Sequence, residues 1–123
     1  MMVYTTYLDR LSELPNDSLK IVIMRYQPKV NLFEFENVKF VKCLSPSDIL
    51  LTEYKTNKIT FKEFSEKFKN ELKNNLESTR MLSRIKNCKR DVYLICCEKS
   101  PLECHRSIIA DILKNQGCNC KEF

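Results

Sequence analysis

Glycine is nearly absent from this chain, which has one glycine and four prolines among its 123 residues. Secreted scaffolds held together by disulfides are usually shorter, contain an even number of cysteines, and are rich in glycine and proline. This chain has seven cysteines, most of them beside hydrophobic runs. We therefore expect reduced thiols, some of which pack as small hydrophobic side chains.

Long hydrophobic runs are absent as well. No segment approaches the roughly 18 apolar residues that a membrane span needs, and the first residues lack the basic and apolar regions of a signal peptide. A hydrophobic fraction of 43% with 30% charged residues excludes a disordered chain. These features predict one soluble, cytoplasmic domain over residues 1–123, with no membrane partner.

The net charge of +5 comes entirely from the middle third of the chain. Residues 55–90 contain eleven Lys and Arg and four Asp and Glu, whereas each flanking segment has one more acidic than basic residue. Such a segment is able to contact nucleic acid. Because no nucleic-acid-binding motif accompanies it, a solvated helix face is the favoured interpretation, and nucleic acid stays an alternative partner.

Apolar runs and alternating patterns predict strands. They occur at Met2–Tyr7, Lys20–Arg25, Val38–Leu44 and Asp91–Cys97. Two of these strands are too apolar to have one face in water, which is typical of a sheet covered on both faces. Together with the helices described next, they predict an α/β fold: a small Rossmann-like, mostly parallel sheet of about four strands flanked by helices.

Helix-capping signals define the middle of the chain. Ser45 before Pro46 predicts one helix start, and Thr60 with Glu63 forms the capping box of another. After this capping box, large apolar residues recur at spacings of three and four. They are Phe61, Phe64, Phe68, Leu72 and Leu76. This stripe predicts one long helix that packs against the core.

The last helix has the clearest start signal. Ser100 is expected to cap it, Pro101 and Glu103 favour its first turn, and Gly117 is expected to end it as the C′ residue. Residues 96–106 hold three of the seven cysteines and the only histidine. They join the last predicted strand to this helix, and ligands of α/β sheets bind at such junctions.

Three adjacent residues at this junction are candidate catalytic groups. Cys104 is the expected nucleophile, because a helix N-terminus and a nearby arginine stabilise a thiolate. His105 is the expected acid or base, and Arg106 the clamp for an oxyanion or a phosphate. Each residue also has a structural interpretation when taken singly, and it is their clustering that favours a site.

Two related chemistries fit less well. Zinc would find donors in Cys97, Cys104, His105 and the pair at Cys118 and Cys120. However, no CxxC pair is present, and the last two cysteines lie about 20 Å away along the helix, so we predict no metal and no cofactor. The phosphate-binding loop of tyrosine phosphatases and rhodaneses is excluded too, because the nine-residue step from Cys97 to Arg106 contains no glycine.

The segment Cys97-Glu98-Lys99, followed by Pro101 and then by Cys104-His105-Arg106, resembles the signature of the domain-of-unknown-function-488 family. Tyr4-Thr5-Thr6-Tyr7 resembles the start of its first strand, and segments within residues 23–28 and 44–64 resemble its second strand and middle helices. The resemblance implies a compact, Rossmann-like α/β domain. The resemblance indicates the site more firmly than the reaction, because the family has no settled activity. Met24 and Tyr26 depart from the family pattern near the end of the second strand.

The expected ligand is a phosphate-bearing small molecule, a nucleotide or nucleoside derivative, with hydrolysis or group transfer as the reaction if the protein is an enzyme. Tyrosines would stack on it, threonines and a carboxylate would bond to it, and arginine would supply charge. The candidate ligand-binding residues are Tyr4, Thr5, Thr6, Tyr7, Arg25, Cys97 and Glu98. Alternatives are a non-catalytic sequestering or sensing module and a redox thiol protein. The sequence does not determine the oligomeric state, and a homodimer is one of the alternatives.

Overall fold

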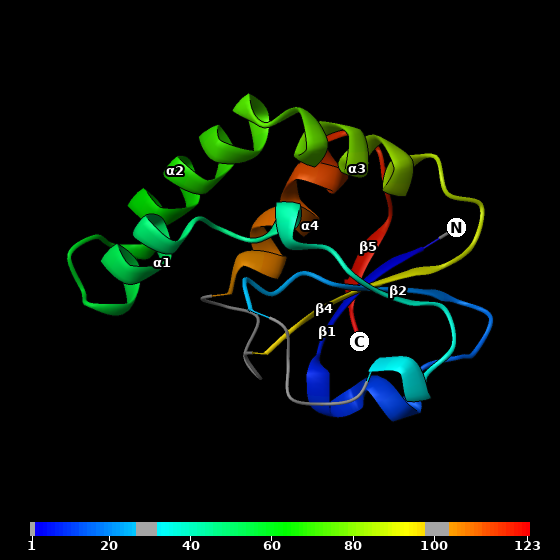
Figure 1. Ribbon diagram of the computed structural model, residues 1–123. Helices are drawn as coiled ribbons and strands as arrows, with labels where there is room; N and C mark the ends of the chain where they lie inside the picture. Colours follow the sequence, from blue (N-terminus) through cyan, green and yellow to red (C-terminus); the bar gives the residue numbers. More distant parts are fainter. Residues whose placement is uncertain (1, 27–31, 98–103) are drawn as a thin grey trace.

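Five parallel strands form one sheet within residues 2–26, 32–97 and 104–123, the parts of the chain that the computed structural model describes (Figure 1). They are β1 (Val3–Tyr7), β2 (Leu19–Val22), β3 (Val38–Phe40), β4 (Val92–Cys96) and β5 (Cys120–Glu122). Their order across the sheet is β3-β2-β4-β1-β5. The α/β class and the parallel sheet predicted from the sequence are confirmed.

The four strands expected from the sequence are all present, although each is shorter than its hydrophobic run. The third ends at Phe40, because Lys42–Leu44 form a short 3-10 helix, η3. The sheet has one strand more than expected, β5 at the C-terminus. This strand has three residues, none of them buried, so it lacks the apolar pattern that identifies the others.

Helices cover the two faces of the sheet unequally (Figure 1). One face carries α1 (Asp48–Lys55), α2 (Phe61–Asn74), α3 (Leu76–Lys86) and α4 (His105–Asn115), whereas the other carries the 3-10 helices η1 (Leu8–Glu13) and η2 (Leu32–Glu34). Along β4, Leu94 and Cys96 belong to the core on the α-helical side, and Tyr93 and Ile95 to the core on the other side. This alternation directs Cys96 toward the α-helices.

The predicted long helix is two helices that meet at Asn75. Its capping box is confirmed: Glu63 N donates to Thr60 Oγ1 at 3.1 Å, and Thr60 N donates to a Glu63 carboxylate oxygen at 3.0 Å. Asn75 ends α2 and caps α3, because its side-chain oxygen accepts a hydrogen bond from Ser78 N at 3.1 Å. Leu76 therefore starts a new helix and is 63% exposed, so its assignment to the buried stripe is wrong.

The first α-helix also begins later than expected. Ser47, and not Ser45, caps α1, since its hydroxyl accepts a hydrogen bond from Leu50 N at 3.2 Å. The Ser45 hydroxyl instead donates to the Lys42 carbonyl at 2.6 Å and so closes η3. At the other end of the chain, Gly117 follows α4 with a φ of 93°, a left-handed conformation that favours glycine, as predicted.

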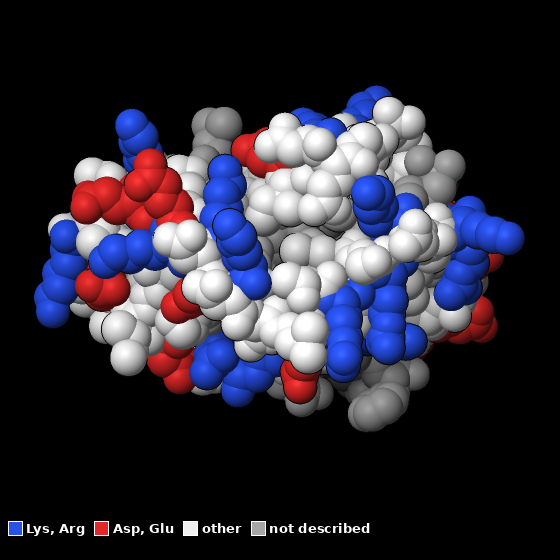
Figure 2. Space-filling model, turned by 90° about the horizontal axis from the view of Figure 1, so that it is seen from above, with Lys and Arg blue, Asp and Glu red and all other residues white. Residues whose placement is uncertain are grey.

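The basic middle segment lies on the surface. All eleven Lys and Arg residues between positions 55 and 90 are exposed. Viewed from above the α-helices, basic side chains are spread over the surface with acidic side chains among them (Figure 2). This arrangement fits a solvated helix face. None of the helices in the described part of the chain combines the length and apolar character that a membrane crossing requires.

The break at Asn75 leads to a stability prediction. Phe68 is fully buried whereas Leu76 is exposed, so Phe68→Ala is expected to lower the free energy of unfolding by about 3–5 kcal/mol. Leu76→Ala should change it by less than about 0.5 kcal/mol. Urea-induced unfolding followed by circular dichroism measures both. Equal losses would mean that the two residues share one buried stripe after all.

Candidate functional site

A cavity of about 120 Å³ opens at the carboxyl ends of β2 and β4. Its walls come from the segment after β2, the end of β4, the start of α4, and helices α1 and α2. The lining residues are Met24, Arg25, Tyr26, Pro46, Leu51, Tyr54, Lys55, Phe64, Cys96, Cys97, Cys104 and His105. The cavity therefore lies where open parallel sheets bind ligands, at the junction predicted from the sequence.

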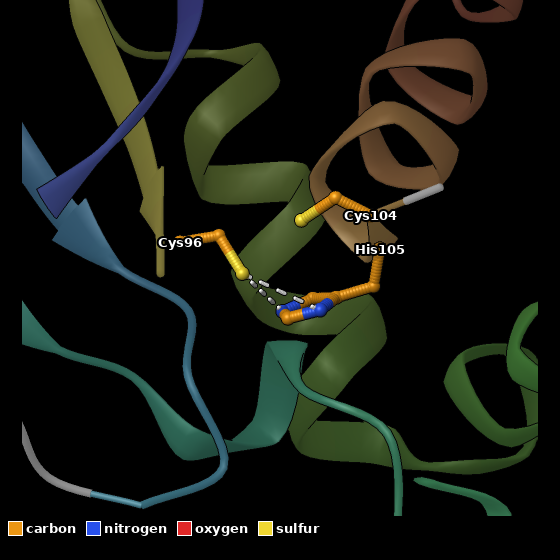
Figure 3. A group of neighbouring side chains, drawn as sticks. All are labelled: Cys96, Cys104 and His105. Carbon is orange, nitrogen blue, oxygen red and sulfur yellow. Dashed lines mark hydrogen bonds between the residues drawn. The ribbon is translucent and has the colours of Figure 1, made fainter. Parts of the chain in front are cut away.

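Cys96, Cys104 and His105 form a buried cluster at this cavity, with side chains that point toward one another (Figure 3). They are 1%, 2% and 9% exposed. One ligand atom from each residue lies within 4.8 Å of the others, close enough for a single metal ion to contact all three. The Cys96 Sγ is 3.6 Å from both ring nitrogens of His105.

The position of the His105 ring is fixed from two sides. Its Nε2 is hydrogen-bonded to the carbonyl oxygen of Ile23. A carbonyl oxygen only accepts, so Nε2 carries the hydrogen and donates it. The ring of Phe68 packs edge-on against the imidazole, with 5.8 Å between the ring centres. This arrangement leaves Nδ1 as the nitrogen available to the sulfur atoms.

The pKa values of the two buried thiols, Cys96 and Cys104, are shifted in opposite directions. A hydrogen bond from the Cys96 thiol, with further help from His105 and from the backbone N–H of Arg106, holds the pKa of Cys104 well below its usual range. Hydrogen bonds to Cys104 and Cys97, together with burial, raise the pKa of Cys96. The negative charge therefore resides on Cys104, at the positive end of the α4 dipole.

The last helix begins at His105, with Cys104 in the N-cap position. The expectation that Ser100 caps this helix is therefore wrong. Ser100 itself lies outside the described residues, as do Glu98, which the sequence suggests as a ligand-binding residue, and the other residues of the 98–103 segment. The later start places Cys104 in the N-cap position, where the backbone N–H of Arg106 bonds to its sulfur.

Arg106 is directed away from the cavity. Its fully buried guanidinium bonds to the Glu122 carboxylate, with distances of 3.0 Å from Nη2 and 3.3 Å from Nε. Thr5 Oγ1 donates to the same carboxylate at 2.5 Å. Arg106 Nη1 also lies 3.8 Å from Cys104 Sγ. Arg106 does not line the cavity, so its contacts fit a residue that positions Cys104 and not a clamp on a ligand.

The structure divides the other sequence-based candidates into two groups. Arg25 and Cys97 line the cavity, whereas Tyr4, Thr5, Thr6 and Tyr7 do not. Tyr4 stacks on Tyr93 at a ring distance of 4.7 Å, on the face of the sheet opposite the α-helices. Thr5 faces Glu122, Thr6 is fully buried, and Tyr7 is half-buried at the end of β1.

Cys96 is the main residue that the sequence analysis missed. The sequence places it in the predicted strand Asp91–Cys97 without choosing between Cys96 and Cys97 as the inward-facing residue. In the structure Cys96 belongs to the core, and its sulfur also faces Cys104 and His105. One signal could have found it: the alternation of side chains along β4 places Cys96 on the α-helical side. Tyr54 and Lys55, on α1, also had no sequence signal as cavity residues.

The charge on Cys104 predicts an unusual pH dependence of alkylation. A lowered pKa keeps the thiolate present as the pH falls, so the rate with iodoacetamide should stay nearly constant between about pH 8 and pH 6. Burial raises the pKa of Cys43 and of Cys120, so their rates should fall about tenfold per pH unit. Mass spectrometry of each cysteine-containing peptide measures this. A Cys104 rate that falls in parallel with the other two would contradict the assignment.

The buried ion pair predicts a second asymmetry. Glu122→Gln leaves the Arg106 charge buried without a carboxylate and should lower the free energy of unfolding by about 1.5–3 kcal/mol. Glu13→Gln removes the carboxylate of the more exposed Arg10–Glu13 pair, which should cost at most about 1 kcal/mol. Chemical unfolding compares the two variants. The role assigned to Arg106 fails if the two costs are equal.

Comparison with known proteins agrees with the resemblance noted in the sequence. A family model described as the active DUF488-N3 subclade matches residues 3–117. No curated protein and no solved structure gives a significant match. The matched region runs from the start of β1 to Gly117, two residues beyond α4, and contains Cys96 and the Cys104-His105-Arg106 segment. Because the match covers most of the chain, this protein belongs to the DUF488 family.

Proposed function

We propose that the cavity binds a phosphate-bearing small molecule, a nucleotide or nucleoside derivative. The observation that carries this proposal is the pairing of two basic side chains, Arg25 and Lys55, with walls that are otherwise mainly apolar or aromatic. Small-molecule sites usually combine apolar walls with a few polar groups that fix the orientation of the ligand. Basic residues at such a cavity favour an anionic ligand.

Arg25 is oriented for this role by a neighbouring acid. Its Nε and Nη2 lie 3.2 and 3.3 Å from the two carboxylate oxygens of Asp48, which also accepts a hydrogen bond from the Tyr26 hydroxyl. A guanidinium has five N–H donors, so donors beyond these two suit phosphate oxygens. Asp48 is about half exposed, so water screens its competition with a phosphate.

Two aromatic side chains contribute to the wall of the cavity. Tyr54 and Phe64 both line it, and their rings stack at 4.6 Å with an angle of 27° between the planes. Stacked aromatic side chains suit a planar ring such as a nucleobase. At about 120 Å³, the space fits one part of a nucleotide, with the phosphate directed to the rim where Arg25 and Lys55 lie.

The chemistry we infer is covalent transfer through Cys104. The thiolate attacks the electrophilic centre of the bound ligand. His105 in its imidazolium form, with a second proton on Nδ1, gives that proton to the leaving group as its bond breaks. Water then releases the group in hydrolysis, or a second acceptor takes it in transfer. The matching subclade is described as active, which favours this reaction over simple sequestration. Reduced thiols are also what a cytoplasmic location would maintain.

The proposal predicts which residues control binding. Thermal-shift titration with a nucleotide panel that includes cyclic and ADP-ribose types should identify a stabilising ligand. Arg25→Ala should weaken its binding at least tenfold, since a hydrogen bond to a charged group contributes about 1.5–3 kcal/mol. Lys58→Ala, which removes an exposed lysine outside the cavity, should bind as the unmodified protein does.

Analysis of the ligand after incubation separates the two versions of this function. A chemically changed ligand supports catalysis, and its turnover should be lost in Cys104→Ser while binding persists. An unchanged ligand indicates a sequestering or sensing module. If no member of the panel stabilises the protein, or if Arg25→Ala binds as tightly as the unmodified protein, the cavity is not a nucleotide site.

A further inference from the structure

We propose that Cys96, Cys104 and His105 bind a zinc ion, with the fourth coordination position facing the cavity. This site needs only the three side chains, so zinc binding does not depend on the ligand proposed above. It departs from the metal-free site expected from the sequence. That expectation considered Cys97, Cys118 and Cys120 as partners, whereas the structure replaces them with Cys96.

The separations between the donor atoms match tetrahedral zinc. Bond lengths of about 2.3 Å to sulfur and 2.0–2.1 Å to nitrogen place neighbouring sulfur and nitrogen ligands about 3.5 Å apart, and two sulfur ligands about 3.8 Å apart. Cys96 Sγ lies 3.6 Å from both ring nitrogens of His105, and the three ligand atoms all lie within 4.8 Å of one another. Because the lone pair of Nδ1 lies in the ring plane, zinc binding would turn the Cys96 side chain toward Nδ1.

The hydrogen bond to Ile23 prepares His105 as a ligand. Histidines that bind metals usually donate their second ring N–H to a carboxylate or a backbone carbonyl, which fixes the ring and its tautomer. Here Nε2 donates to the Ile23 carbonyl, so the lone pair is on Nδ1. The edge-on contact with Phe68 adds a second restraint on the ring. The outer contacts that a zinc ligand needs are therefore already in place.

The donor set selects the kind of metal ion. Two thiolates and one imidazole suit zinc, and they neutralise its charge in a buried position. The described residues that line the cavity include no Asp or Glu, so magnesium and calcium, which need oxygen ligands, are disfavoured. Three protein ligands leave one position open, and because all three residues line the cavity, that position is accessible to water or to an anionic group.

Zinc binding has a consequence for the proposed reaction, and this part alone rests on the proposed function. A sulfur atom that coordinates zinc is withheld from attack on a ligand. The metal-free protein would then have a nucleophilic Cys104, whereas the zinc-bound protein would present a metal with an open position. Occupancy by zinc would thus switch the same cavity between two chemical states.

The test uses reduced protein freed of metal with a chelator. Zinc is titrated against a chromophoric chelator, and cobalt(II) serves as a spectroscopic substitute. We expect one equivalent to bind, with the charge-transfer bands of thiolate-bound cobalt and the visible bands of a tetrahedral ion. Cys96→Ser and His105→Gln should each weaken zinc binding more than tenfold. The double variant Cys118→Ser/Cys120→Ser, which alters half-buried thiols outside the site, should bind as the unmodified protein does.

A second measurement needs no variant, because Cys96 and His105 are buried and their replacement risks unfolding. Zinc should slow the alkylation of Cys104 in the unmodified protein and leave that of Cys88 unchanged. Failure to bind one equivalent, binding that survives both Cys96→Ser and His105→Gln, or binding lost in the Cys118→Ser/Cys120→Ser variant would overturn the proposal. Arg25→Ala should keep full zinc affinity, so a failure of nucleotide binding is distinguishable from a failure of the zinc site.

Discussion

The backbone of Ile23 is the connection on which the geometry of the site depends. Its N–H donates to the Ile95 carbonyl at 2.9 Å and so extends the pairing of β2 with β4. Its own carbonyl accepts the hydrogen bond from His105 Nε2. One residue therefore ties two strands to the start of α4. The parallel register of β2 and β4 brings their carboxyl ends to one edge, and this hydrogen bond places the imidazole there beside Cys96.

A buried charge links the same site to the end of the chain. Arg106 follows His105 on α4, and its guanidinium is fully buried against Glu122 on β5. Burying such a charge is costly without a partner, so docking of the last strand and placement of the first turn of α4 depend on each other. Arg106 thus has a structural role in the sequence signature, since its ion pair holds the fold around Cys104. His105, the residue before it, lines the cavity.

Local signals predicted part of the local structure, and long-range placement was predicted poorly. The capping box of Thr60 follows from residues three positions apart, so the sequence was enough. The caps expected at Ser45 and Ser100 are wrong, because Ser47 and Cys104 occupy the N-cap positions of those helices. The break between α2 and α3 arises because the Asn75 side chain caps α3. The three- and four-residue spacing of the apolar residues does not reveal this cap. Two contacts could not be predicted in this way: Cys96 with His105, and Arg106 with Glu122. They depend on which strands lie beside β4 and on how α4 is oriented above the sheet, and no short stretch of sequence encodes either.

The scarcity of glycine bears on how the cavity would recognise the anionic ligand that we propose. The only glycine follows α4 at position 117, in the turn that ends the helix. Phosphate-binding loops depend on glycines to bring several backbone N–H groups close to the ligand. Without them, recognition of the proposed ligand would fall to the side chains of Arg25 and Lys55 and to the N-terminus of α4. Because these side chains lie on separate elements, the proposed site would select its ligand by length as well as by charge.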